Sequence, residues 1–101
     1  MRSHHNEKLA SVIEHELNLI LVRDFNFGGA IVTILDATVS KDNLKARVRL
    51  GIIPYIKEVE AFMEIKKRER EIRHKILKNT RLRAVPKLFF EIVQEQKTET
   101  A

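Results

Sequence analysis

The sequence has 101 residues, of which 44% are hydrophobic and 33% are charged, and its formal net charge is +5 at pH 7. This length suits a single domain, and the apolar content is too high for a wholly disordered chain. The absence of cysteine excludes disulfides, thiolate metal sites and a cysteine nucleophile, and it favours a reducing compartment. We find no signal peptide and no apolar run near the length of about 20 residues that a membrane span needs, so we expect a cytoplasmic protein.

The excess positive charge is concentrated in one segment. Residues 66–87 contain ten Lys and Arg against two Glu, a net charge of +8, whereas the rest of the chain carries −3. Such a block is typical of a protein with a polyanionic partner, most simply nucleic acid. The alternative is a solvated helix face with no partner.

The N-terminal part of the chain predicts a helix and then a loop. Apolar residues recur at three- and four-residue steps over residues 4–23, which places them on one helix face. They are Leu9, Val12, Ile13, Leu17 and Ile20. Gly28 and Gly29 can adopt positive φ without a steric penalty at Cβ, so we expect a loop at this pair.

Two strands follow and form a predicted β-hairpin. Residues 30–39 are rich in Ile, Val and Thr, and residues 44–52 alternate between apolar and mostly basic side chains. A turn-forming stretch, residues 40–43, joins them. Because side chains alternate across a strand, one set should face a core and the other the opposite side of the sheet. The core set is Leu44, Ala46, Val48, Leu50 and Ile52, and the opposite set is Lys45, Arg47 and Arg49.

A second helix is predicted over residues 55–79, with an interruption. Its apolar face comprises Ile56, Val59, Phe62 and Met63 and resumes at Ile72, Ile76 and Leu77. Residues 66–71 are all charged, and a continuous helix would aim Lys66, Glu69 and Arg70 at the core. Either the helix bends here or it runs clear of the body for two turns.

A last strand is predicted over residues 87–93. We interpret Leu82, Val85, Leu88 and Phe90 as core residues. Phe89 and Phe90 point to opposite faces of the strand, so at least one of them is core. The other is either an ordinary surface aromatic or a platform on which a base could stack.

The order helix, strand, strand, helix, strand predicts an α+β fold with a three-stranded sheet and helices packed on one face. This is the order of the type II KH fold, an RNA-binding architecture. KH modules hold RNA with a GxxG loop between two helices, but none of the three glycines lies between the helical segments here. We expect one KH-like domain over residues 1–93 and a disordered polar tail over residues 94–101.

Enzymatic chemistry has little support in the sequence. It contains neither the P-loop nor the dinucleotide-binding glycine pattern, and its histidines do not have metal-ligand spacing. These histidines are His4, His5, His15 and His74. We therefore predict no catalytic residues, no metal site and no cofactor.

The basic residues are the candidate binding site. The main group surrounds the junction of the second helix and the last strand and comprises Arg73, Lys75, Lys78, Arg81, Arg83 and Lys87. A second patch comprises Lys45, Arg47 and Arg49. Arg can bind phosphate in a bidentate manner and Lys supplies a point charge, so both suit contacts to a nucleic-acid backbone. Alternatively, Arg81 and Arg83 pair with acidic residues such as Glu91 and have a structural role.

The segment RLRAVPKLFF, residues 81–90, resembles the signature of the ribosome-binding factor A family, in which RLR is followed by Pro and then by Leu and an aromatic residue. Residues 32–50 resemble the hairpin of that family, and residues 13–25 resemble its first helix. The resemblance covers about residues 6–93.

The resemblance implies a type II KH-like, non-enzymatic factor. It would bind the free 30S small ribosomal subunit, assist 16S rRNA maturation and matter most in the cold. We expect it to act as a monomer without membrane contact. The sequence departs from the family where an Ala-x-Gly kink usually interrupts the second helix, because Arg68, Glu69 and Arg70 stand there. It also ends soon after the last strand and lacks the Asp-Pro pair after the first helix.

A second hypothesis is a protein–protein adaptor that uses the charged second helix and does not contact RNA. Salt dependence distinguishes the two, because binding to nucleic acid weakens steeply with salt and binding through apolar anchors does not.

Overall fold

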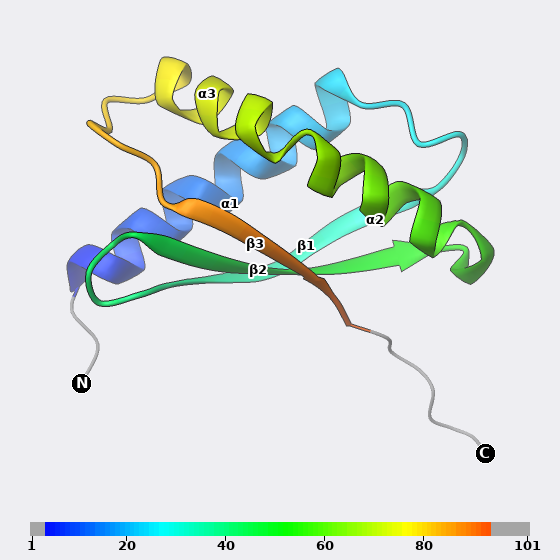
Figure 1. The fold of residues 1–101 in the computed structure, drawn as a ribbon, viewed down its shortest axis with the longest axis horizontal. Helices are drawn as coiled ribbons and strands as arrows, with labels where there is room; N and C mark the ends of the chain where they lie inside the picture. Colours follow the sequence, from blue (N-terminus) through cyan, green and yellow to red (C-terminus); the bar gives the residue numbers. More distant parts are fainter. Residues whose placement is uncertain (1–3, 94–101) are drawn as a thin grey trace.

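The computed structural model describes residues 4–93, so the predicted tail, residues 94–101, lies outside the described residues. Three helices, a 3-10 turn and three strands follow one another along this part of the chain (Figure 1). In order they are α1 (His4–Asp24), β1 (Ile31–Val39), β2 (Lys45–Ile53), η1 (Tyr55–Lys57), α2 (Glu58–Lys67), α3 (Glu69–Asn79) and β3 (Lys87–Ile92). This arrangement confirms the predicted α+β class.

Helix α1 buries four of the five residues of the predicted apolar stripe. Leu9, Ile13, Leu17 and Ile20 are buried in the core, whereas Val12 is only half-buried and the prediction is wrong for it. The loop after the helix contains two left-handed residues, Gly28 with φ 63° and Gly29 with φ 94°. Glycine adopts this region without a steric penalty at Cβ, and the chain turns back here to begin β1.

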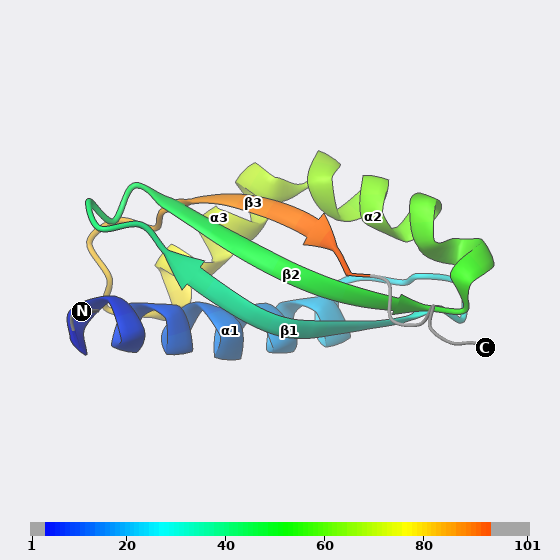
Figure 2. The same cartoon turned by 90° about the horizontal axis from the view of Figure 1, so that it is seen from below.

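The hairpin and the last strand form one mixed sheet in the order β1-β2-β3 (Figure 2). Strand β1 pairs antiparallel with β2, and β2 pairs parallel with β3. A bulge in β1 lies between Ile34 and Asp36. The inner face of β2 is buried as predicted, except that Leu44 is exposed because it precedes the strand and belongs to the turn.

The core lies between one face of the sheet and the helices, which run along the same side in Figure 1. Ile65 of α2 and Ile72 and Ile76 of α3 are fully buried in it. Leu88 and Phe90 of β3 are buried as predicted, whereas Leu82 and Val85 are partly buried against the core. No helix within residues 4–93 covers the opposite face of the sheet, so its side chains meet solvent.

The predicted apolar face of the second helix is wrong for four of its seven residues. Ile56, Val59 and Met63 are 85%, 69% and 57% exposed, and Leu77 is exposed as well. The buried residues of α2 are Glu58, Ala61 and Ile65, which lie almost opposite on the helix. The helix therefore has two apolar faces, and the face with small Ala61 is the one that packs against the body.

Helix α2 ends at a kink at Arg68, which resolves the two alternatives for the charged segment in favour of a bend. Arg68 has φ −103° and ψ 20°, and it is both the C-cap of α2 and the N-cap of α3. The bend keeps Lys66 and Arg70 in solvent, while Glu69 turns toward the sheet.

Candidate nucleic-acid interface

The loop between α3 and β3 presents its basic residues to solvent. At its start, Thr80 Oγ1 donates to the carbonyl of Ile76 at 2.9 Å and accepts from the N–H of Leu82 at 3.3 Å. Leu82 then packs against the core, while Arg81 and Arg83 on either side of it are exposed.

We define the junction cluster as Lys78, Arg81 and Arg83. All three are exposed, and none forms an ion pair with any residue in the described part of the chain. The alternative in which Arg81 or Arg83 pairs with Glu91 is therefore wrong, because Glu91 instead faces Arg47 at 3.6 Å. Three uncompensated cations within a short segment form a surface suited to phosphate groups.

Two of the predicted binding residues have acidic neighbours. Arg73 Nε lies 2.9 Å from a carboxylate oxygen of Glu69. Lys75 Nζ lies 3.0 Å from Asp24 and 3.5 Å from Glu71. Their charges are largely balanced within the protein, so the structure does not bring them together with the junction cluster as free cations.

The face of the sheet that no described helix covers, which we call the open face, carries the other predicted cations. Arg49 forms an ion pair with Asp36 at 3.0 Å, and Arg47 forms the longer pair with Glu91. Lys45 and Lys87 are directly opposite each other in the β2–β3 register. Neither of them forms an ion pair within residues 4–93. This face therefore has two compensated arginines and two uncompensated lysines.

Phe89 lies among these cations on the open face. Its neighbour Phe90 is buried, which confirms that one of the two aromatics belongs to the core, and Phe89 is 44% exposed. Lys87 Nζ lies 5.7 Å from the centroid of the Phe89 ring. We define the sheet patch as Lys45, Arg47, Lys87 and Phe89.

The junction cluster and the sheet patch meet at one end of the molecule. Lys87 is the first residue of β3 and directly follows the loop, and its N–H donates to the carbonyl of Leu44 at 3.0 Å. Figure 1 shows the loop beside the starts of β2 and β3. The turn residue Asp42 adds a negative charge at this end. Hydrogen bonds from the Ser40 hydroxyl and from the N–H of Leu44 lower the pKa of its carboxyl.

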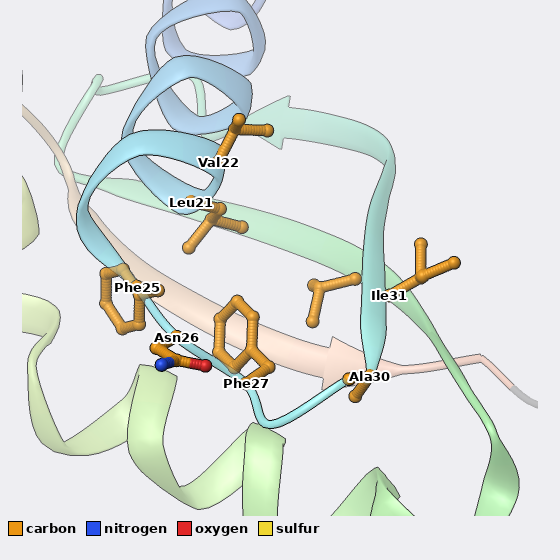
Figure 3. Close-up of a pocket in the computed structure, with 9 residues that line it drawn as sticks. Leu21, Val22, Phe25, Asn26, Phe27, Ala30 and Ile31 are labelled. Atoms are coloured by element: carbon orange, nitrogen blue, oxygen red, sulfur yellow. The ribbon is translucent and has the colours of Figure 1, made fainter.

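A hollow of about 520 Å³ lies at the opposite end of the molecule, between the end of α1 and the start of β1 (Figure 3). Its labelled side chains are apolar apart from Asn26, and Phe25 and Phe27 stack at 5.2 Å between ring centroids. Because no charged side chain of the described residues lines this hollow, it does not suit a phosphate-bearing ligand.

Three residues that organise this site could not be assigned that role from the sequence. Glu69 accepts the N–H of Leu88 at 2.7 Å, and Glu14 accepts the N–H of Ala37 at 3.1 Å. Arg68 lies over the Phe25 ring at 3.8 Å. The sequence singles out Glu69, as a charged residue at a position that a continuous helix would aim at the core, and Arg68, as a residue at the expected kink, but it does not single out Glu14.

Among the described residues, no group of three or more His, Asp or Glu is placed to hold a metal ion. No helix in this part of the chain is long and apolar enough to span a membrane.

Comparison with known proteins identifies the family. A family model described as ribosome-binding factor A matches residues 5–100. The chain belongs to the ribosome-binding factor A family. A ribosome-binding factor A from Chlorobium luteolum is 36% identical over 93 residues, which is 88% of this chain and 78% of that protein. One from Chlorobium phaeobacteroides is 33% identical over 87 residues, which is 83% of this chain and 75% of that protein.

Solved structures of the ribosome-binding factor A family have the same fold. The crystal structure of the Thermus thermophilus protein matches with a TM-score of 0.69 at 19% identity, over 86% of this chain and 94% of that one. A homology model of the Thermus thermophilus protein, fitted into the cryo-EM map of a 30S–RbfA complex, matches with a TM-score of 0.63 at 22% identity, over 90% and 93% of the chains. These matches confirm the predicted order of helices and strands.

Proposed function

We propose that this protein is a non-catalytic assembly factor that binds the free 30S subunit and assists maturation of its 16S rRNA. Family membership supports this proposal, and a relative of the same fold has been fitted into a 30S–RbfA complex. We further propose that it acts as a cytoplasmic monomer and that the need for it is greatest in the cold.

The observation that carries the proposal is the junction cluster. Lys78, Arg81 and Arg83 are exposed and have no acidic partner among the described residues, although the chain contains 14 Asp and Glu. Uncompensated cations attract polyanions and release counterions when they bind phosphates. With the sheet patch beside them, they provide a basic surface for folded rRNA. Such contacts position a protein on RNA without reading its sequence.

The test is sedimentation with purified small subunits. The double variant Arg81→Glu, Arg83→Glu should no longer co-sediment with the subunits at moderate salt, because both contacts become repulsive. The matched control is Lys67→Glu with Arg70→Glu, which makes the same charge change at two exposed cations near the kink. The control should still bind. Full binding by the junction variant, or equal loss in both, would show that the junction cluster is not the interface.

A protein–protein adaptor is the second candidate, and one observation favours it. Helix α2 and the turn before it expose Ile56, Val59 and Met63, which are large apolar side chains on one face. An adaptor that uses this face would lose its partner on Val59→Ser with Met63→Ser and would be insensitive to salt. An RNA-binding factor would show the opposite result in both measurements.

A further inference from the structure

The open face of the sheet has a hollow of about 470 Å³ beside the exposed Phe89 ring. Its lining spans all three strands, with Thr38 from the end of β1, Lys45 and Arg47 from β2, and Phe89 from β3. The sheet register explains this grouping, because Arg47 is opposite Thr38 on one side and opposite Phe89 on the other. The volume falls within the range of roughly 300–1,000 Å³ that is usual for small-ligand sites.

The Phe89 ring is partly exposed on the open face of the sheet, and Lys87 Nζ lies over one of its two π-faces. Phe90, the next residue, provides the buried aromatic of β3, so the core does not use the Phe89 ring. Successive bases of single-stranded nucleic acid stack on such rings, and the contact tolerates any base because every base has a π-face. A base inside a duplex cannot use the ring in this way, because both of its faces are already stacked.

The cations around the ring fit the phosphates on either side of a stacked base. Lys87 Nζ lies over one face of the ring, Lys45 is opposite Lys87 in the register, and Arg47 lines the hollow, so the base would stack on the other face of the ring. Two acids among residues 4–93 face this group. Glu91 is 3.6 Å from Arg47 with both side chains largely exposed, so this pair can open at small cost. The exposed carboxylate of Asp42 interacts electrostatically with Lys45 without forming an ion pair with it. The site therefore combines one stacking surface with positive charge, which is the combination that single-stranded sites use.

We propose that the sheet patch binds an unpaired nucleotide of RNA, with its base stacked on Phe89 and its flanking phosphates on Lys45, Arg47 and Lys87. This inference rests on the proposed contact with rRNA, and it adds that part of the contacted RNA is single-stranded. The protein would engage a single-stranded segment on the sheet while the junction cluster contacts the backbone of folded RNA beside it.

The test compares two labelled RNAs of about ten nucleotides, a length that such sites accommodate. One is an ordinary unstructured strand, and the other is an abasic strand with the same phosphates. Binding to the full-length protein is measured by fluorescence anisotropy. The wild-type protein should prefer the strand with bases by roughly 5- to 150-fold, and Phe89→Leu should remove that preference while binding to the abasic strand stays unchanged.

Leu35→Ala is the matched control. Leu35 is also 44% exposed, and it lies over Gly51 on the same face of the sheet but outside the hollow. It should leave the binding of both strands unchanged. Phe89→Trp, which enlarges the ring, should preserve or increase the preference for bases, and it provides a second measurement if the Leu variant does not fold.

The outcomes separate this inference from the proposed function. Equal wild-type binding to both strands overturns the stacked nucleotide, as does an equal effect of Phe89→Leu and Leu35→Ala. If neither strand binds but the protein still sediments with small subunits, the sheet-patch inference is wrong and the proposed function stands. A preference for bases that depends on Phe89, together with unchanged subunit binding by the junction variant, supports the sheet patch and refutes the junction cluster.

Discussion

At the scale of single residues, Arg68 stabilises the bend between α2 and α3, at the position where the family resemblance implies an Ala-x-Gly kink. Its guanidinium lies 3.8 Å above the Phe25 ring and donates to both carboxylate oxygens of Glu71, at 3.0 and 2.7 Å. The N–H of Arg68 is also shared between the carbonyls of Glu64 and Ile65. A side chain with five donors thus connects the end of α2, the start of α3 and the loop after α1. The bend does not need the backbone freedom of glycine.

The pair of Arg68 and Glu71 predicts a specific pH dependence. The hydrogen bond from Arg68 lowers the pKa of Glu71 from 4.5 to about 2. Because the folded-state pKa is the lower one, the contribution to stability is complete above about pH 4.5 and is lost as the pH falls toward 2. In urea titrations over this range, Glu71→Gln should lose less stability with falling pH than the wild-type protein.

Glu60→Gln is the control for that experiment, because it removes the same charge from an exposed position on α2. It should retain the pH dependence of the wild type. If both variants lose stability with pH in the same way as the wild type, the Arg68–Glu71 contact does not stabilise the fold.

At the scale of elements, each edge strand of the sheet donates a backbone hydrogen bond to a carboxylate on a helix. Glu14 of α1 accepts an N–H from β1, next to its bulge, and Glu69 of α3 accepts an N–H from β3. Unpaired N–H groups on edge strands invite pairing with other chains, so these contacts protect the edges as well as stabilise the fold. The contact made by Glu69 also fixes the start of β3, which carries both Lys87 and Phe89.

Glu69→Ala should therefore destabilise the protein. The side chain is largely buried, and its loss leaves the N–H of Leu88 without its acceptor, which costs roughly 1–3 kcal/mol of the free energy of unfolding. Glu69→Gln keeps a carbonyl acceptor and should lose less. Urea unfolding followed by circular dichroism measures both. An Ala variant as stable as the wild type would mean that the Leu88 N–H is satisfied without Glu69.

The elements show how far the sequence predicts the fold. The alternation of β2 identifies its buried face because it has only one apolar set. The period of α1 identifies most of its buried face, although it includes Val12 wrongly, and Leu19 and Val22 are exposed. Helix α2 has two such sets, and the choice between Val59 and Ala61 depends on how closely the helix approaches the sheet. The sequence also does not decide whether the second helix bends, because the stacking of Arg68 on Phe25 joins residues that are far apart in the chain.

At the scale of the whole molecule, the candidate site also depends on contacts between residues far apart in the chain, which the sequence does not show. The sequence locates the basic segment, but it does not show which charges are compensated. Lys75 and Lys78 are one turn apart on α3 and are chemically identical. Lys75 lies 3.0 Å from Asp24, a residue 51 positions away, whereas Lys78 has no ion pair within the described residues. The distribution of acidic partners, rather than the number of cations, therefore defines the surface that is free to bind a polyanion.

This difference predicts opposite effects for one substitution at two sites. Lys78→Gln removes a free cation, so the slope of log affinity against log salt for small-subunit binding should fall by about 1. Lys75→Gln removes a compensated cation, so it should leave the slope unchanged and lower the stability of the fold instead. Binding measured between about 50 and 200 mM salt gives the slopes, and urea unfolding gives the stabilities. Equal changes of slope in the two variants would mean that RNA draws Lys75 away from Asp24, and the interface would then extend along α3 beyond the junction cluster.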